Sequence, residues 1–326
     1  MAKIIGRTGA IGIGIESTQG TKVAASYWVP VQGYSYDDKI ELVKNDSAMG
    51  RIEEFNAANI TKLWGEGDYE GKIFLSSVGA ELVALFGQSP TSVQRTTTGV
   101  YDHTYALLNN NDHKSLTVCY EDAIQEISFP FAMIDSWSLE VATDDYVKRS
   151  ISLMGKKSES ATHTPSFTNE IEFVPSHVSF KIASAQSGLA GASAINVTGF
   201  KMEIKKNAEP LYVLGSNEPN DIVNKQFAVT GSVDLYFENT TYRDFVFANT
   251  HKAIRIDMTD ASTIIGSSGS HNPELYFDLN EVVFDEFERG WDANDPLSQT
   301  LNFEALFNLS DAAMISARLT NTIASY

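Results

Sequence analysis

The sequence contains a single cysteine, Cys119, and six histidines in 326 residues. One cysteine excludes an internal disulfide, and no spacing of cysteine and histidine resembles a zinc site. The apolar neighbours of Cys119 indicate a small buried residue in a strand rather than a nucleophile. We therefore expect neither a metal nor a cofactor.

Basic residues are scarce: 24 Lys and Arg stand against 42 Asp and Glu, which gives a formal net charge of −18. The formal net charge is −7 over residues 1–162 and −11 over residues 163–326. Such a surface repels phosphate backbones, which excludes tight nucleic-acid binding through a basic footprint. Transient contact with DNA that must not adhere remains compatible with this charge.

Long apolar runs are also missing. The longest patch, around residues 80–86, falls far short of the roughly 20 residues that a membrane helix needs. The N-terminus shows no basic region followed by an apolar segment, so we expect no secretory signal and no membrane insertion. With 43% hydrophobic residues, the chain can bury one large core or two ordinary ones.

Catalytic motifs are lacking as well. Gly12 and Gly14 begin like a dinucleotide-binding fingerprint, but the third glycine and the βαβ context are missing. Residues 278–295 hold seven acids and one base, Arg289, without calcium-loop spacing or a histidine partner for acid–base chemistry. No nucleophile elbow or phosphate-binding loop occurs. We expect a protein that is not an enzyme.

What the sequence does contain is a repeated unit. Residues 71–75 have the composition of a strand, and residues 78–86 place apolar side chains on one face of a short helix that ends at Gly87. Residues 227–249 repeat this order, with Asn249 in place of Gly87 as a left-handed cap. This repetition suggests a tandem duplication.

A second repeat supports this interpretation. The strand predicted at 113–122 and the strand predicted at 251–260 both begin His-Lys, carry apolar residues at the fourth and sixth positions and end in Asp. Two further strands follow each, at 134–142, 146–154, 275–287 and 297–306. The predicted fold is mainly β: two tandem antiparallel β-sandwich or open-barrel domains, each with one short α-helix.

Composition divides the chain into four parts. Residues 1–26, rich in small residues, are expected to form an extended arm. Residues 27–155 form the first domain, and residues 156–172 form a polar linker. Residues 173–326 form the second, diverged domain.

Residues 44–59 are polar, rich in small residues and too long for a tight hairpin, so they predict a projecting loop. Loops of this length are uncommon unless they are functional. Residues 215–225 are its expected counterpart in the second domain.

Several short segments of the first 155 residues occur in a characteristic order. They are Gly14-Ile-Glu16-Ser-Thr-Gln-Gly20-Thr21, Tyr27-Trp-Val-Pro30, Trp64-Gly-Glu-Gly-Asp-Tyr-Glu-Gly71, the helix at 79–87, His113-Lys-Ser-Leu and Ile151-Ser-Leu-Met-Gly155. In order and spacing they resemble the major tail tube proteins of long-tailed (siphovirus-like) bacteriophages.

The resemblance implies a tube-type domain that assembles into rings, usually of six domains, stacked through a long loop and terminal arms. The rings enclose a channel that conducts DNA to the host. Implied partners are other copies of the chain and the tail terminator, tape-measure and tail-tip proteins. The implied location is the virion tail, with assembly in the host cytoplasm. Most members carry one domain, so two domains here imply a trimeric, pseudo-hexameric ring.

An acidic channel wall follows from this function, because a cationic wall would retain the passing DNA. The candidate lining residues are Glu140, Asp144, Asp145, Glu281, Asp285, Glu286 and Glu288. The candidate residues for contact between rings are Asp46, Met49, Arg51, Glu53, Glu54, Phe55, Glu218 and Asp221. The alternatives are a β-sandwich module that binds a ligand or receptor, and a phage tail ring protein that does not polymerise.

Overall fold

The computed structural model describes residues 3, 5–96, 99–267, 269 and 271–326. The strands of the first half are β1 (Ala10–Ile15), β2 (Tyr27–Val29), β3 (Gly33–Tyr34), β4 (Asp37–Asn45), β5 (Ala57–Lys72), β6 (Thr91–Gln94), β7 (Tyr101–Ala106), β8 (Leu116–Glu121), β9 (Glu126–Ala142), β10 (Lys148–Gly155) and β11 (Glu159–Ser160). Those of the second half are β12 (Val178–Ala183), β13 (Ala194–Ile195), β14 (Gly199–Lys205), β15 (Ala208–Leu211), β16 (Asp221–Asn224), β17 (Ala228–Tyr236), β18 (Lys252–Thr259), β19 (Glu274–Gly290), β20 (Ser298–Ala305) and β21 (Ile315–Asn321).

Strand pairing is antiparallel and follows the same order in both halves. In the first half β2 pairs with β1, β1 with β8, β8 with β9, β9 with β10, β10 with β5, and β5 with β3 and β4. In the second half the corresponding order is β13, β12, β18, β19, β20, β17 and β14. The mainly β, antiparallel prediction is therefore confirmed.

One short α-helix follows the same strand in each half, as expected. Helix α1 (Ser77–Phe86) comes after β5, and α2 (Thr241–Phe247) comes after β17. The residues that end them take left-handed backbone conformations, with φ of 83° at Gly87 and 48° at Asn249. Neither α-helix of the described residues is long and apolar enough to cross a membrane.

A pair of glycines marks the correspondence between the halves. Gly71 of β5 lies opposite Arg149 of β10, and Gly231 of β17 lies opposite Phe303 of β20. A Cβ atom at Gly231 would approach the Phe303 ring to 2.5 Å, and one at Gly71 would approach the Arg149 guanidinium to 3.2 Å. Both glycines admit a large side chain from the neighbouring strand.

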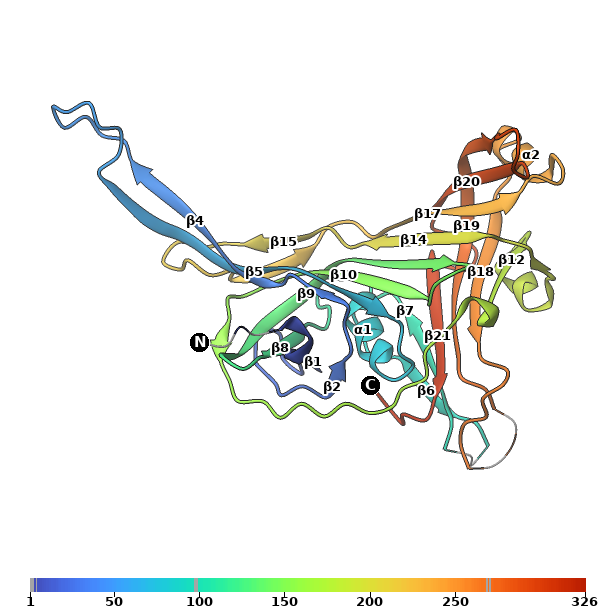
Figure 1. Ribbon diagram of the computed structural model, residues 1–326, viewed down its shortest axis with the longest axis horizontal. Helices are drawn as coiled ribbons and strands as arrows, with labels where there is room; N and C mark the ends of the chain where they lie inside the picture. Colours follow the sequence, from blue (N-terminus) through green and yellow to red (C-terminus); the bar gives the residue numbers. More distant parts are fainter. Residues whose placement is uncertain (1–2, 4, 97–98, 268, 270) are drawn as a thin grey trace.

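The two halves share one hydrophobic core. The largest cluster of buried side chains includes residues of β9 and β10 together with residues of β17 to β21. Trp137 of β9 packs against Phe277 of β19 with ring centroids 5.4 Å apart. Strand β7 of the first half also pairs with β21 of the second, so the halves form one body (Figure 1).

The sequence-based prediction of an extended arm over residues 1–26 is wrong for residues 10–15. These residues form β1, a buried strand between β2 and β8. Its glycines allow close packing: a Cβ atom at Gly12 would lie 2.6 Å from the Cβ of Ala25. Glycine is depleted in strands, so the two glycines of this segment kept the sequence analysis from predicting a strand here.

Two further boundaries differ from the sequence prediction. Strand β5 begins at Ala57 and β4 ends at Asn45, so residues 44–59 form the end of a long two-stranded hairpin instead of a loop alone. Residues 88–111, a polar segment after α1 for which no strand was predicted, contain β6 and β7, which pair with each other. Both pairings are hairpins between consecutive strands, and the polar composition of these segments gave little strand signal.

Candidate assembly surfaces

Eight strands form a continuous curved sheet in the order β4, β5, β10, β9, β14, β17, β20 and β19. Strand β3 extends the position of β4 along the same edge of β5. The sheet consists of two groups of four strands, one from each half. Figure 1 shows it running from the projecting β4–β5 hairpin to the end of the molecule that carries α2.

The junction between the two groups is the pairing of β9 with β14. It extends from Gly199 opposite Ala142 to Lys205 opposite Ser136. The same part of β9 pairs with β10 on its other edge. Both edges of β9 are therefore satisfied within the chain.

The outer borders of the sheet are not satisfied in this way. Residues 283–290 of β19 pair with β20, and within the described residues their other edge has no strand partner. Strands β3 and β4 pair only with β5 among the described strands. In the repeated pairing order β19 corresponds to β9, and the edge formed by β3 and β4 corresponds to β14. Strands β9 and β14 are the two that meet at the internal junction. Open strand edges favour pairing with another chain.

One face of this sheet is polar because side chains alternate along each strand. In β9, Trp137, Leu139 and Val141 are buried, whereas Ser138 and Glu140 face solvent. One row of facing residues crosses seven strands on the polar side: Lys72, Lys148, Glu140, Lys201, Ser232, Asn302 and Glu286. Part of this face is hollowed, between Glu140 and Asp285.

Lysines on the polar face are paired with carboxylates in the first group of strands and at the junction. The Lys201 ammonium lies 3.0 Å from Glu140, and that of Lys205 lies 3.1 Å from Glu203. Lys148 pairs with Asp145, and its hydrogen bond lowers the pKa of that carboxyl group. Charge is therefore nearly balanced on this part of the face.

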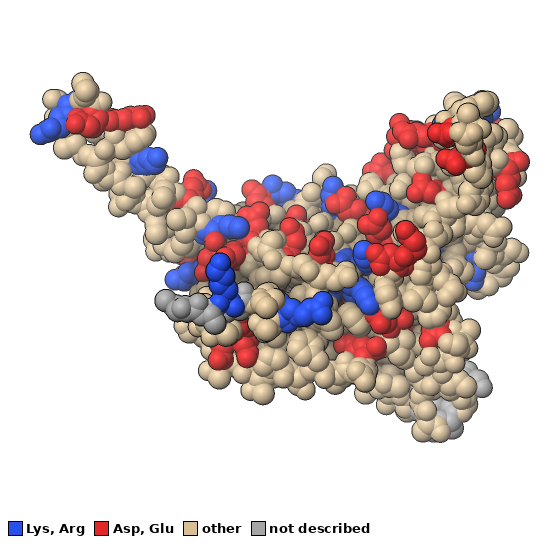
Figure 2. Space-filling model, in the orientation of Figure 1, with Lys and Arg blue, Asp and Glu red and all other residues tan. Residues whose placement is uncertain are grey.

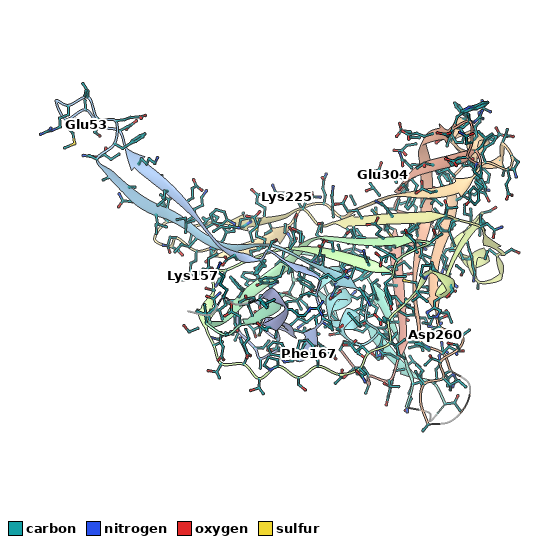
Figure 3. All side chains as sticks on the ribbon, viewed as in Figure 1. Glu53, Lys157, Phe167, Lys225, Asp260 and Glu304 are labelled. Carbon is teal, nitrogen blue, oxygen red and sulfur yellow. The ribbon has the colours of Figure 1, made fainter. Side chains whose placement is uncertain are left out.

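The second group of strands is acidic instead. Among the described residues no ion pair involves Asp285, Glu286, Glu288 or Glu304; the Glu286 carboxylate accepts a hydrogen bond of 2.7 Å from Asn302. Figure 2 shows acidic side chains gathered at the end of the molecule that carries α2 and β20. Glu304 lies on the side of the sheet that faces the projecting hairpin (Figure 3).

The structure brings only some of the predicted lining residues together. Glu140, Glu286 and Glu288 lie on the polar face by register, and Asp285 is the extra residue at an irregular step of β19. Asp144 and Asp145 lie in the turn between β9 and β10. Glu281 is paired with His251 at 2.7 Å, outside these rows. Sequence reasoning missed Glu203, Asp234 and Glu304, which the alternation within residues 199–205, 228–236 and 298–305 could have indicated.

The β4–β5 hairpin projects beyond the body of the protein, and its tip is residues 46–56 (Figure 1). One side of the hairpin is apolar, with Ile40 opposite Leu63 and Leu42 opposite Ile60. Three of these four side chains are exposed. At the tip the Lys44 ammonium lies 4.8 Å from the centroid of the Phe55 ring. The candidate residues Asp46, Met49, Arg51, Glu53, Glu54 and Phe55 are all exposed in this segment.

The corresponding connection of the second half is the short β15–β16 hairpin, which lies at the base of the long one. The backbone NH of Leu63 donates a 2.7 Å hydrogen bond to the carbonyl of Asn217. Candidate residue Glu218 pairs with Lys157 at 3.1 Å, whereas Asp221 starts β16 and accepts from its neighbour's backbone NH. These two candidates therefore lie apart from the tip residues.

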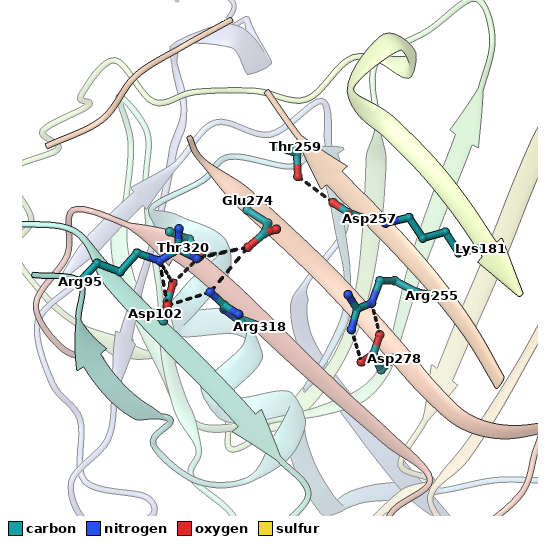
Figure 4. A network of polar contacts seen from close by, with 10 residues as sticks. All are labelled: Arg95, Asp102, Lys181, Arg255, Asp257, Thr259, Glu274, Asp278, Arg318 and Thr320. Carbon is teal, nitrogen blue, oxygen red and sulfur yellow. Dashed lines mark hydrogen bonds and ion pairs between the residues drawn. The ribbon is translucent and has the colours of Figure 1, made fainter. Parts of the chain in front are cut away.

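A polar network joins β7 of the first half to β21 and β19 of the second (Figure 4). The Asp102 carboxylate accepts hydrogen bonds from Arg95, Arg318 and Thr320 at 2.7–2.8 Å. Glu274 of β19 lies 3.6 Å from Arg95. These contacts fix the second half against the first.

A buried lysine makes a further contact between the halves. Lys206, directly after β14, donates a 2.7 Å hydrogen bond to the carbonyl of Ala84 near the end of α1. Burial lowers the pKa of its ammonium to about 7. The Nε2–H of nearby His113 donates a 2.8 Å hydrogen bond to the carbonyl of Leu108. Burial lowers the pKa of His113 to about 4.

The described residues contain no group of three His, Cys, Asp or Glu side chains that could hold a metal ion. Cys119 is buried in β8, as the sequence predicted, and burial raises the pKa of its thiol. A buried thiol with a raised pKa is a poor nucleophile.

Comparison with known proteins gives one informative result. A search of curated proteins finds no match. The sequence model of a family described as phage tail tube protein matches residues 6–305, which include both groups of four strands and both hairpins. The match extends beyond the first 155 residues that carried the resemblance. The chain therefore belongs to the phage tail tube protein family.

Proposed function

We propose that this chain is a structural subunit, not an enzyme, and that three copies close a pseudo-hexameric ring. The rings stack into a tube through which DNA passes to the host. The observation that carries the proposal is the β9–β14 junction, which joins two equivalent four-stranded groups inside one chain. It provides a template for the contact between chains.

The open borders supply the two sides of that contact. The edge of β19 at residues 283–290 corresponds to the edge of β9 that pairs with β14. The edge of β3 and β4 corresponds to that of β14. Pairing of β19 in one chain with β3 and β4 of the next is a head-to-tail contact, and such contacts generate rings when the rotation closes. Closure removes both open borders of this sheet.

The stoichiometry follows from the duplication. We propose tube domains at residues 27–155, to which β1 adds a strand, and at residues 173–326, with residues 156–172 as the linker between them. Each chain then fills two ring positions, so three chains fill six. The repeated order of strand pairing supports this division.

The polar face of the sheet is the proposed channel wall. Its carboxylates repel the phosphates of DNA, and the lysines at its centre are neutralised by Glu140 and Glu203. A wall without free cationic groups does not exchange counterions with DNA, so DNA can slide past it. The acidic sector at β19 and β20 would occur three times around the channel.

The two hairpins are the proposed contacts between successive rings. The apolar side of the β4–β5 hairpin is exposed over Ile40, Leu42 and Ile60. Exposed apolar surfaces of this kind mark protein contacts. The tip residues 46–56 would reach the next ring, with the shorter β15–β16 hairpin beside them. The proposed further partners are the tail terminator, tape-measure and tail-tip proteins, with assembly in the host cytoplasm.

Electron microscopy and native mass spectrometry of the purified chain test this proposal together. We expect tubes, and at low protein concentration rings whose mass equals three chains. Rings of six chains would contradict the pseudo-hexameric arrangement. Single rings that never stack would favour a tail ring protein that does not polymerise.

A further inference from the structure

We propose that helix α2 of one chain docks, through Phe247, into a groove on the first half of the next chain in the ring. The groove lies beside β3 and has a mixed lining, with the apolar or aromatic residues Val31, Tyr34, Tyr120 and Phe167 and the polar residues Arg7 and Gln32. This inference rests on the proposed ring and adds a second contact beside the strand pairing. The occupant is a second copy of this chain.

The internal junction shows what such a contact looks like. Strand β14 of the second half pairs with β9 of the first half and leads, through Lys206, to the end of α1. Its inward side chains, Phe200, Met202 and Ile204, are buried. Lys206, which follows them, hydrogen-bonds to Ala84 of α1. Strand pairing and helix contact therefore occur together at this junction.

The register identifies the matching segment of the first half. Glu203 of β14 lies opposite Thr230 of β17, and Gly33 of β3 lies opposite Glu70 of β5. Thr230 and Glu70 directly precede the matching glycines Gly231 and Gly71. Residues 199–205 thus correspond to residues 29–35, so residues 29–35 of the next chain should pass over α2.

Helix α2 has a face that needs such a cover. All residues of α1 are buried, whereas none of α2 is. Phe247 is 70% exposed, and the Arg243 guanidinium lies 4.6 Å from the centroid of its ring. A large exposed aromatic side chain on a short helix is a typical anchor of an interface.

The groove has the size and chemistry for this anchor. It encloses about 710 Å³ and is bounded on one side by Val29, Val31 and Tyr34. Phe167 on its rim is 52% exposed. Helix α2 lies at one end of the molecule, whereas β2 and β8 lie in the body below the sheet (Figure 1), and Phe167 lies with the latter (Figure 3). Surfaces separated in this way do not meet within one chain but can meet in a ring.

Cross-linking tests the contact directly. The variant Phe247→Cys/Val31→Cys, assembled into rings and treated with a short bis-maleimide, should give covalent species of two and three chains on denaturing gels. The matched control is Phe247→Cys/Ile264→Cys, since Ile264 is 63% exposed and lies outside the groove. Rings that form normally but show no cross-linking above the control would overturn the inference while leaving the ring intact. Absence of wild-type rings would instead overturn the proposed function.

A charge substitution gives an independent readout. Phe247→Asp should raise the protein concentration needed for ring formation at least tenfold, because it removes the aromatic anchor of the contact. Its urea unfolding should match that of Ile264→Asp, because both side chains are exposed in the free chain. Ring formation at the wild-type concentration by a folded Phe247→Asp variant would overturn the inference.

Discussion

Helices α1 and α2 occupy the same place in the repeated unit but have opposite surroundings. Helix α1 is covered on all sides, by its own half and by Lys206 and Tyr326 of the second half. Helix α2 is open on one side. The difference teaches that α1 is covered by β1, β2, β7 and β9 of its own half as well as by the second half, whereas α2 packs mainly against β19. In the proposed ring, the missing cover of α2 would come from another chain.

The interiors of the two halves also differ. Arg149 of β10 and Glu81 of α1 form a buried ion pair at 3.0 Å. Phe303 occupies the position of Arg149 in the second half and stacks on Phe200 with centroids 6.0 Å apart. The same backbone is thus stabilised by ionic contacts in one half and by aromatic packing in the other.

The largest expected effect concerns the two unequal hairpins. Deleting residues 46–56 should abolish tubes and leave soluble rings, because the tip is the part of the chain that reaches furthest from the sheet. Negative-stain microscopy is the measurement. Shortening residues 212–218 of the β15–β16 hairpin is the matched control and should reduce tube length less. Long tubes from the 46–56 deletion would remove the long hairpin from the stacking contact.

The comparison of interiors predicts a large stability effect in the first half. Glu81→Ala should lower the free energy of unfolding by about 3–5 kcal/mol, because it leaves Arg149 charged and buried without a partner. The double variant Glu81→Leu/Arg149→Met should recover most of this loss, since the second half is stable with Phe303 in this position. Urea unfolding of the three proteins measures both. An equal loss in the single and double variants would contradict the account.

The acidic sector predicts an effect on DNA passage. Replacing Glu286, Glu288 and Glu304 by Lys should reduce DNA delivery at least tenfold, because a cationic wall retains phosphates by counterion release. Tubes should still form. The charge-neutral control replaces the same residues by Gln and should change delivery less. Normal infectivity of phage carrying the Lys variants would place these side chains outside the channel.

The smallest expected effect is a pH dependence at Lys206. Its pKa of about 7 in the folded chain lies below the value of roughly 10.4 in the unfolded chain. Between these values the unfolded chain binds more protons, so stability rises with pH, by at most about 1.4 kcal/mol per pH unit. Lys206→Met should lose this rise between pH 7 and 9.

Tyr36 provides the control for that measurement. It follows β3 as Lys206 follows β14, and burial raises its pKa well above the ordinary value of a tyrosine. Tyr36→Phe should therefore keep the wild-type dependence of unfolding free energy between pH 7 and 9. An unchanged slope in Lys206→Met would show that its ammonium does not titrate in this range.

The repeated unit was predictable from sequence because its signals are local. The short helices, the caps at Gly87 and Asn249 and the His-Lys strands follow from side-chain period and backbone preference. The candidates Glu140, Glu286 and Glu288 share the polar face of the sheet, and their place in a channel wall stays a prediction.

The remainder depended on contacts that no local pattern encodes. Strand β1 is rich in glycine and becomes a strand only between β2 and β8. Glu304 lies on the polar face of the sheet because β20 pairs with β17, and the β9–β14 junction joins residues about 60 positions apart in sequence, as the register shows.

A cryo-EM reconstruction of the assembled tube tests the central claim most directly. The account predicts three chains per ring, with residues 283–290 of each chain paired to β3 and β4 of the next as β9 is paired to β14 within the chain. Six chains per ring, or β19 edges that remain open in the tube, would contradict it.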